Sequence, residues 1–422
     1  MDYRAPKGTA DMLPETARAW EHMQRTAQEL FARYGYQPLY PPVFEHTEIF
    51  ARGIGEATDI VSKEMYTFED RGGRSVTLRP EATASIVRAS LEHNLVPPGS
   101  VAKLYFMGPM FRYERPQAGR MRQFWQIDAE ILGAAEPSAD AEMIALLARY
   151  FETLGITGTT LLVNSMGDDA CRPQYREKVR AYIREHSEQL CEECARRADT
   201  NPLRAFDCKK PTCRDVMDLA PKLRDELCRD CAAHYSAVKG YLDDLGIAYV
   251  EDPSLVRGLD YYTRTVFEIQ APGLGAQNAI GGGGRYDRLM EQFGGPPTPG
   301  LGFALGFERT LLVMQAQGLR VPAPATAEVY VARAQPEVAS AVFELAARLR
   351  EAGIAAELDH QARSLKSQFK QADRLGARFV LVVGPDELAG GEVTVRAMAT
   401  SQERRAPLSG IAEVLQGLLA EG

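Results

Sequence analysis

The sequence predicts an α+β core, built on an antiparallel sheet with flanking helices, and a C-terminal α/β domain with a mixed sheet. Paired runs of alternating apolar and polar residues, one pair turning at Gly72 and Gly73, indicate hairpins in the core. Amphipathic segments follow these runs, as expected for helices packed on a sheet. After residue 327, strand and helix patterns alternate, which indicates the second domain. A chain of 422 residues is long enough for about two or three domains.

Composition and charge narrow the class of protein. The chain has 45% hydrophobic and 25% charged residues, as globular proteins do. Its net charge of −8 provides no overall attraction to nucleic acid, so such a partner would have to bind local basic patches. The first residues contain no apolar secretion signal, and no apolar run of about 18 residues follows. We therefore expect a cytoplasmic protein with no membrane partner.

The core elements follow one another in a regular order. Residues 14–34 form an amphipathic pattern with a proline at the start and a glycine after the end, which predicts a helix. The next segment is extended, and Pro41 and Pro42 exclude it from the middle of a sheet. After the glycine hairpin, two strand patterns at 102–115 and 122–133 are joined by a basic loop, and a helical period then returns.

A helical segment interrupts the core. From about residue 168 to residue 246 the chain is charged, is helical in period and contains all seven cysteines, whereas strand patterns resume at Ala248. A stretch rich in proline and alanine, VPAPATA, ends the core and is typical of a linker. The predicted boundaries are 1–167 and 247–320 for the core, 168–246 for a helical insertion, 321–327 for the linker and 328–422 for the α/β domain.

Two glycine-rich stretches do not match standard nucleotide-binding loops. GGGGRYD lacks the Gly-Lys-Ser/Thr ending of a phosphate-binding loop, and GLGFALG has Leu305 in place of the third glycine of a dinucleotide fingerprint. Glycine within a strand permits close approach of another strand or of a ligand. We expect a ligand here because of the charged residues near these strands.

Arginines and carboxylates gather at predicted strand ends. Arg112 and Glu114 are two residues apart on one predicted strand and would share a face. Arg309 lies in the first turn of a predicted helix, a place that disfavours a cation unless an anion binds there. A single charge of this kind is usually a solvated surface residue, but this set spans four separated strands and therefore predicts a site. The other members are Glu81 and Thr83 after one strand, and Gln126, Asp128 and Glu130 on one face of another.

The order of these motifs resembles a known family. YPPVFE, FRYERPQ followed by RQFWQIDAE, and GFER are similar to the three signature motifs of class II aminoacyl-tRNA synthetases. LRPEAT, RGLDYYTRTVFE and GGGGRYD resemble the histidyl-tRNA synthetase family in particular, over essentially the whole chain. Ala82 is a departure, because many relatives have glycine there. The resemblance implies that histidine and ATP with Mg²⁺ form histidyl-adenylate and diphosphate, and that the histidyl group then passes to its tRNA with release of AMP.

The resemblance also assigns residues to ATP. Attack of a carboxylate on the α-phosphate builds negative charge, which preplaced cations stabilise. Arg112 and Arg257 are the expected catalytic residues, on opposite sides of the α-phosphate, and Gly258 relieves crowding beside the second. An ion pair between Arg257 and Asp260, or a surface salt bridge, is the alternative. The expected ATP-binding residues are Arg112, Glu114 at the adenine amino group, Arg120, and Arg309 at the γ-phosphate.

Bound histidine needs acceptors for its ammonium group and partners for both ring nitrogens. Glu81 and Thr83 suit the ammonium group, and Glu130 suits a ring N–H. A site of this kind rejects analogues that lack its hydrogen bonds by about 10⁴-fold or more, so no editing domain is expected. Core packing in a strand is the alternative for the tyrosines. The resemblance implies histidine-binding roles for Glu81, Ala82, Thr83, Arg112, Gln126, Glu130, Arg257, Tyr261, Tyr262 and Tyr286.

Two basic surfaces are candidates for tRNA contact. In the basic loop, Arg115, Gln117 and Arg122 are placed to reach the acceptor end of tRNA and contact phosphates. In the C-terminal domain, where the resemblance places anticodon recognition, cations recur every four residues on one predicted helix. Such a stripe is usually a solvated face, which is the alternative here. Its members are Lys366, Lys370, Arg374 and Arg378.

The insertion carries cysteines at metal-binding spacing. Two CxxC pairs flank a further cysteine pair, which is typical of a structural zinc site, whereas free thiols in a reducing cytosol are the alternative. Six candidates exceed the four ligands that such a site takes, and Cys171 stands apart with no visible role. The candidates are Cys191, Cys194, Cys208, Cys213, Cys228 and Cys231.

Two other functions compete with this interpretation. One is a synthetase-like regulatory subunit that binds histidine and a phosphoribosyltransferase, but the intact arginines and the C-terminal domain argue against it. The other is a class II synthetase for a different amino acid, which RGLDYY disfavours. The segment before Pro42 matches the motif that forms the dimer interface in this class, so we expect a two-fold symmetric homodimer.

Overall fold

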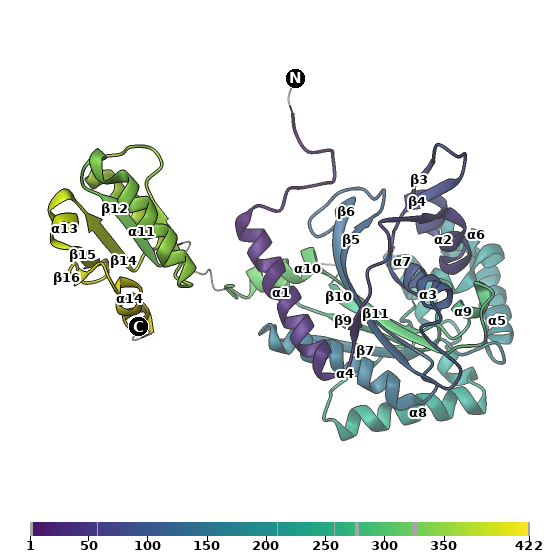
Figure 1. The fold of residues 1–422 in the computed structure, drawn as a ribbon. Helices are drawn as coiled ribbons and strands as arrows, with labels where there is room; N and C mark the ends of the chain where they lie inside the picture. Colours follow the sequence, from purple (N-terminus) through teal and green to yellow (C-terminus); the bar gives the residue numbers. More distant parts are fainter. Residues whose placement is uncertain are drawn as a thin grey trace. The chain divides into compact units, whose positions relative to one another are not determined.

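A computed structural model describes residues 3–56, 58–208, 210–256, 258–274, 278–321 and 327–420. The chain divides into two compact units, Met1–Val321 and Pro322–Gly422 (Figure 1). Most of the predicted linker at 321–327 lies outside the described residues. Within the described ranges, no helix has both the length and the apolar character needed to cross a lipid bilayer.

The first unit is built on an eight-stranded sheet with the order β1-β5-β6-β11-β10-β9-β7-β8. Neighbouring strands from β5 to β7 are antiparallel, and the edge strands β1 and β8 pair in parallel. The prediction of an antiparallel core sheet is therefore confirmed. The strands are β1 (Gln37–Pro38), β5 (Ala102–Phe111), β6 (Gln123–Leu132), β7 (Thr160–Ser165), β8 (Val250–Glu251), β9 (Thr263–Gln270), β10 (Ala279–Arg285) and β11 (Gly300–Gly306).

Helices cover both faces of this sheet, because successive residues of a strand point to opposite sides. Ile127, Ala129 and Ile131 of β6 pack into one core, so Gln126 and Asp128 face the other side. α3 (Thr83–Glu92) and the insertion pack on that second side. The helices of the first side are α1 (Pro14–Arg33), α4 (Pro137–Thr153), α8 (Arg229–Asp244) and α10 (Phe307–Ala316) (Figure 1).

Glycines in β10 and β11 make room for a buried carboxylate. Gly302 pairs with Glu130 across the two strands, and a Cβ added at Gly302 would lie 1.6 Å from Glu130 Oε2. A Cβ added at Gly283 would lie 1.9 Å from the Gly302 carbonyl oxygen. These glycines are therefore required for close approach of a side chain and of a neighbouring strand, whatever ligand binds above them.

A small sheet and short helices complete this part of the unit. The order of the small sheet is β2-β4-β3, and its tight turn has Gly73 at a φ of 73°, in agreement with the predicted glycine turn. The elements are β2 (Phe44–His46), β3 (Tyr66–Glu69), β4 (Ser75–Leu78), α2 (Thr47–Ile54), a π-helix at Ile60–Glu64 and α9 (Leu289–Gln292).

The segment from residue 168 to residue 246 is helical. The buried Asp140 carboxylate ties its last helix, α8, to the core: it accepts a hydrogen bond from Arg285 Nε at 2.8 Å and lies 3.2 Å from His234 Nε2. The elements before α8 are α5 (Arg172–Glu185), α6 (Glu192–Thr200), α7 (Pro211–Asp218) and 3-10 turns at Ser187–Gln189, Pro202–Asp207 and Leu223–Glu226.

The second unit has a five-stranded sheet with the order β13-β12-β14-β15-β16. β12 pairs in parallel with β13 and β14, and the remaining pairs are antiparallel, so the predicted mixed sheet is confirmed. α13 and β16 are not predicted, because the first is too short to show a helical period and the second is a charged edge strand. The elements are β12 (Val329–Arg333), β13 (Ala356–Leu358), β14 (Phe379–Val383), β15 (Glu392–Ala397), β16 (Glu403–Pro407), a 3-10 turn at Pro336–Val338, α11 (Ala339–Glu351), α12 (Leu365–Leu375), α13 (Pro385–Gly390) and α14 (Ile411–Ala420).

Candidate active site

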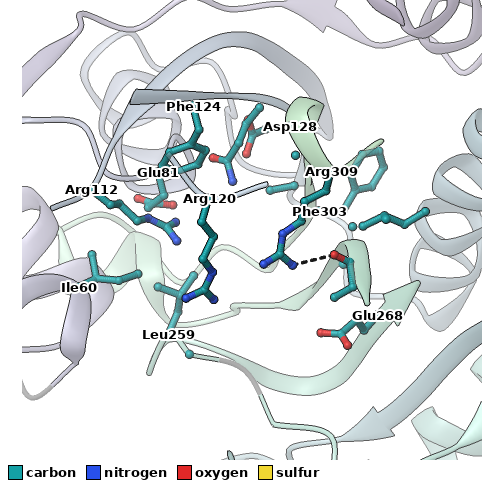
Figure 2. A pocket seen from close by; sticks show the side chains of 18 of the residues that line it. Ile60, Glu81, Arg112, Arg120, Phe124, Asp128, Leu259, Glu268, Phe303 and Arg309 are labelled. Atoms are coloured by element: carbon teal, nitrogen blue, oxygen red, sulfur yellow. Dashed lines mark hydrogen bonds between the residues drawn. The ribbon is translucent and has the colours of Figure 1, made fainter. Parts of the chain in front are cut away.

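A cleft with a volume of about 450 Å³ lies on the side of the main sheet to which Gln126 and Asp128 point. Strands β6, β9, β10 and β11 contribute lining residues, as do the loop after β5 and the turn before β9. Figure 2 shows Arg112, Arg120 and Arg309 pointing into this space from separate segments. The predicted gathering of arginines and carboxylates at the sheet therefore exists in three dimensions.

Buried carboxylates and hydroxyls form a network beside the cleft. Glu81 accepts hydrogen bonds from the backbone N–H groups of Thr83 and Ala84, each at 2.9 Å, and so caps the first turn of α3. The Thr83 hydroxyl donates to Glu130 Oε1 at 2.6 Å, and the Tyr286 hydroxyl donates to Glu130 Oε2. Burial raises the pKa of Glu81 and raises that of Glu130 well above its usual value. Four of the predicted histidine-binding residues thus lie together here: Glu81, Thr83, Glu130 and Tyr286.

Gln126 and Asp128 present acceptor atoms to the cleft. Gln126 Oε1 and Asp128 Oδ2 are buried and receive no hydrogen bond from any residue in the described parts of the chain. Burial, reinforced by the nearby Glu81, raises the pKa of Asp128 well above its usual value. A buried acceptor without a donor costs about 1–3 kcal/mol, so this part of the cleft suits a ligand that brings donors. Ala82, by contrast, is fully buried and is not among the residues that line the cleft.

Tyr261, Tyr262 and Tyr286 form an aromatic cluster at the cleft. The ring centroid of Tyr261 lies 4.7 Å from that of Tyr262 and 5.6 Å from that of Tyr286. Core packing in a strand, the alternative given for Tyr261 and Tyr262, does not apply to them, since β9 begins at Thr263. Asp260 N–H instead donates to the carbonyl of Ile54, at 3.1 Å, so the residues before β9 form a turn outside the sheet.

Two arginines are held by backbone carbonyls at the cleft. Arg112 Nε donates to the Pro80 carbonyl and Arg309 Nη1 donates to the Ala279 carbonyl, each at 2.8 Å. The dashed line in Figure 2 marks the bond of Arg309. Burial lowers the pKa of Arg309, and the positive charge of Arg120 lowers it further. Fixed guanidinium groups of this kind match the bidentate geometry of phosphate oxygens.

Glu114 and Arg120 face each other across the loop that follows β5. Arg120 Nη1 lies 3.0 Å from Glu114 Oε2. The prediction that Arg112 and Glu114 share one strand is wrong, because β5 ends at Phe111. Glu114 N–H donates to the Arg112 carbonyl at 2.8 Å, which bends the chain away from the ladder, although both side chains still line the cleft.

Arg257 lies outside the described residues, so the structure gives no position for this predicted catalytic side chain. Its neighbour Gly258 lines the cleft. The alternative partner for the arginine, Asp260, accepts a hydrogen bond from Asn201 Nδ2 at 3.0 Å.

Apart from Arg214 of α7, four polar residues of the cleft are not among those predicted from the sequence. Gln270 Nε2 donates to Glu268 Oε1 at 3.0 Å, and Asn278 Nδ2 donates to Gln270 Oε1 at 2.9 Å. Burial raises the pKa of Glu308 to about 7. Strand alternation could have identified Glu268 and Gln270, because residues two apart on one strand point to the same face of the sheet. All four line the cleft: Glu268, Gln270, Asn278 and Glu308.

The basic loop has one anchored and two exposed members among the residues predicted to contact tRNA. Arg115 and Gln117 are exposed. Arg122 is half-buried, and its guanidinium carbon lies 3.8 Å from the ring centroid of Tyr113. Arg122 therefore also has a packing role within the loop.

The predicted basic stripe of the second unit is shorter than expected. Lys366, Lys370 and Arg374 are exposed on α12, which ends at Leu375. The assignment of Arg378 to the same helix is wrong: its Nη1 donates to the Leu419 carbonyl at 2.8 Å, at the end of α14.

The cysteines fall into two groups, and all seven are free thiols. Cys228 and Cys231 lie with Cys171 and Asp168, so the prediction that Cys171 stands apart is wrong. Cys171 and Cys231 are 60 residues apart in the chain, which hides their contact from any spacing rule. In the other group the four sulfurs lie within 4.8 Å of one another, a set that matches a tetrahedral zinc site: Cys191, Cys194, Cys208 and Cys213.

A mainly antiparallel sheet bearing a cleft of fixed arginines and buried carboxylates, with a separate mixed-sheet domain, defines a class II aminoacyl-tRNA synthetase. The family model of histidyl-tRNA synthetase matches residues 8–310, and that of an anticodon binding domain matches residues 328–418. The chain belongs to the histidyl-tRNA synthetase family.

Individual relatives agree with this assignment over nearly the full chain. The chain is 47% identical to the histidine–tRNA ligase of Halothermothrix orenii over 419 residues, which cover 99% of this chain and 100% of the relative. It is 49% identical to the histidine–tRNA ligase of Anaeromyxobacter dehalogenans over 417 residues, which cover 99% of this chain and 100% of the relative. The crystal structure of apo S. aureus histidyl-tRNA synthetase superimposes with a TM-score of 0.84 at 37% identity, covering 98% of this chain and 99% of that one.

Proposed function

We propose that this chain activates histidine with ATP in the cleft of the first unit and transfers the histidyl group to its tRNA. One observation carries the proposal: a single cleft combines buried acceptors that receive no donor from the described residues with guanidinium groups held by backbone carbonyls. The acceptors suit the ammonium and imidazole N–H groups of histidine, and the cations suit phosphates.

Histidine is bound at the carboxylate network. Glu81, Asp128 and Gln126 accept hydrogen bonds from its ammonium group, with the Thr83 hydroxyl beside them. Glu130, already oriented by two hydroxyl donors, accepts from a ring N–H. Tyr261 and Tyr262 pack against the imidazole ring, and the Tyr286 hydroxyl fixes the carboxylate. Ala82 supports this site from the core rather than by contact.

ATP is bound by the arginine-lined part of the cleft. Arg112 holds the α-phosphate and Arg309 holds the γ-phosphate. Glu114 accepts a hydrogen bond from the adenine amino group, and Arg120, its ion-pair partner, orients it. ATP enters with Mg²⁺, as in the family, and Glu268 supplies the carboxylate oxygens that this hard cation prefers.

The chemical step combines charge stabilisation with positioning. The histidine carboxylate attacks the α-phosphate, the bond to the diphosphate breaks, and negative charge grows on the equatorial oxygens. Arg112 and Arg257 stabilise that charge from opposite sides, with Gly258 leaving room for the second. The adenylate then passes its histidyl group to the 3′ end of tRNA, and AMP leaves.

Contacts to tRNA come from both units. Arg115, Gln117 and Arg122 of the basic loop bind the acceptor end, and the second unit, which matches an anticodon binding domain, binds the anticodon arm. On α12 the backbone contacts are made by the exposed cations Lys366, Lys370 and Arg374.

The insertion, with boundaries near residues 168 and 246, holds a structural zinc ion. Four thiolates bind the metal, from Cys191, Cys194, Cys208 and Cys213.

The chain acts as a cytoplasmic homodimer, and its catalytic part ends near residue 321. Two apolar side chains around the first signature motif are exposed, Tyr40 (61%) and Phe44 (54%), and they support the dimer.

Pyrophosphate exchange with each of the twenty amino acids tests the proposal. Exchange is expected with histidine and at background level with the others. Exchange supported by a different amino acid and not by histidine would overturn it.

A further inference from the structure

A second group of metal-binding side chains lies where the insertion meets the catalytic core. Asp168 follows β7, and Cys171 is the residue just before α5. Cys228 caps the N-terminus of α8, and Cys231 lies in the first turn of that helix. The Sγ and carboxylate oxygen atoms all lie within 4.8 Å of one another. Cys171 and Cys231 are buried, and the other two are half-buried.

The separations between these atoms match a tetrahedral ligand set. A zinc ion with Zn–S bonds of about 2.3 Å and a Zn–O bond of about 2.0 Å requires about 3.8 Å between sulfurs and about 3.5 Å from sulfur to oxygen. The Sγ atoms of Cys171 and Cys231 are 3.9 Å apart. Asp168 Oδ1 lies 3.6 Å from Cys171 Sγ and 3.8 Å from Cys228 Sγ.

The surrounding backbone orients the ligands. Asp168 N–H points to Cys171 Sγ at 3.3 Å, and Cys231 N–H points to Cys228 Sγ at 3.5 Å. Ala170 N–H donates to Asp168 Oδ1 at 3.0 Å. Amide donors directed at ligand atoms are the outer-shell contacts that hold thiolates and carboxylates in place around a metal.

The chemistry of the group also suits a divalent cation. Asp168 supplies a carboxylate, and a metal ion binds cysteines as thiolates with release of their protons. Arg264 Nη2 lies 3.5 Å from Asp168 Oδ2 and offsets part of the negative charge of the ligands.

We propose that Asp168, Cys171, Cys228 and Cys231 form a second zinc site, separate from the four-cysteine site of the insertion. It fastens α5 and α8, the first and last helices of the insertion, to the core. It also braces the turn before β9, because Arg172, the residue after Cys171, donates through Nη1 to the Tyr262 carbonyl at 2.7 Å. An effect of this bracing on histidine binding rests on the role proposed for Tyr262. The metal site itself does not depend on the proposed function.

Metal analysis of the full-length protein tests the second site. The wild type, purified under reducing conditions with zinc in the medium, is expected to hold two zinc ions per chain. The double variant Cys171→Ser with Cys231→Ser is expected to hold one zinc ion per chain. The matched control, the double variant Cys194→Ser with Cys213→Ser, is also expected to hold one zinc ion, because it disrupts only the other site. A single zinc in the wild type that survives the first double variant and is lost in the second would overturn the proposal.

Thiol labelling keeps the test decisive if a variant does not fold. Alkylation of the intact wild type, mapped by mass spectrometry with and without a zinc chelator, is expected to show that the chelator exposes Cys171, Cys228 and Cys231. Equal labelling of these three thiols in both arms, or a Cys171–Cys231 disulfide in place of free thiols, would contradict it. Since neither readout uses activity, failure here is distinct from failure of histidine activation.

Discussion

The Thr83 hydroxyl donates a hydrogen bond to Glu130 Oε1 at 2.6 Å and thereby joins the first turn of α3 to β6. The other oxygen of this carboxylate accepts from the Tyr286 hydroxyl. Glu130 of β6 is thus held by α3 and by the residue that follows β10, while burial raises its pKa well above the usual value. The same side chain therefore affects both the stability of the core and, under our proposal, recognition of the histidine ring.

Glu130→Gln is expected to separate these two effects. Because the folded-state pKa is raised, ionisation of Glu130 costs stability as pH rises from the unfolded-state value through the folded-state value. The variant lacks this cost, so its free energy of unfolding relative to wild type should increase with pH, by about 1 kcal/mol or more near pH 8. Its kcat/KM for histidine should fall by about 10²-fold or more, since a charged acceptor is lost.

Urea unfolding between pH 5 and pH 8 and histidine-dependent pyrophosphate exchange measure the two effects. Glu344→Gln, at an exposed position of α11 in the second unit, is the control and should change neither. A Glu130→Gln variant that activates histidine normally would remove Glu130 from the recognition site.

Gly302→Ala is expected to destabilise the protein by more than about 2 kcal/mol, because the added Cβ would overlap Glu130 Oε2 at 1.6 Å and lie 2.8 Å from the Ala129 carbonyl oxygen. Gly240→Ala is the matched control, since it lies in α8 with nothing within 4 Å of the added atom. That variant should gain about 0.5–1 kcal/mol from helix propensity. Equal unfolding midpoints for the two variants would mean that the strand glycines are not required for packing.

Much of the fold follows from local sequence patterns. The helix predicted at 14–34 is α1, because periodicity, a proline start and a glycine stop are local signals. Arg309 lies in the first turn of α10, as expected. The turn that carries Tyr261 and Tyr262 could not be predicted in the same way. Its residues have strand propensity, but a hydrogen bond to the distant Ile54 carbonyl removes them from the sheet.

The candidate site was predictable where strand alternation or a family motif marked a residue, as for Glu81 and Gln126. The partition of the cysteines was not, because Asp168 and Cys171, just before α5, meet Cys228 and Cys231, at the start of α8, only in the folded chain. Likewise, the role of Gly302 depends on its register with Glu130 across β11 and β6, which tertiary pairing alone determines.

Arg257→Ala is expected to lower kcat and kcat/KM for adenylate formation together, by about 10²–10³-fold, with little change in ATP binding. The reason is that a cation matched to the growing charge on the α-phosphate acts mainly in the transition state. Pyrophosphate exchange and equilibrium ATP binding are the two measurements. Arg184→Ala, which removes an exposed ion pair with Asp199, is the control; near-normal exchange in Arg257→Ala would reduce Arg257 to a structural ion-pair partner.

Removal of the second unit is expected to separate the two half-reactions. Residues 1–321 form a compact unit and contain every residue assigned to histidine and ATP, so this fragment should retain histidine-dependent exchange. It should lose most tRNA charging. In the full chain, Lys370→Ala with Arg374→Ala should weaken tRNA binding and reduce the slope of log K against log salt by about one unit per lost phosphate contact. A fragment that charges tRNA as well as the intact chain does would argue against anticodon binding by this unit.

The most direct test of the account is ATP-dependent attachment of radiolabelled histidine to the tRNA for histidine, measured as acid-precipitable label with the purified chain. We predict that label accumulates only when ATP and that tRNA are both present, and that an excess of unlabelled histidine, but not of another amino acid, abolishes it. A chain that forms no labelled tRNA under these conditions, while remaining folded and competent to bind ATP, would contradict the account.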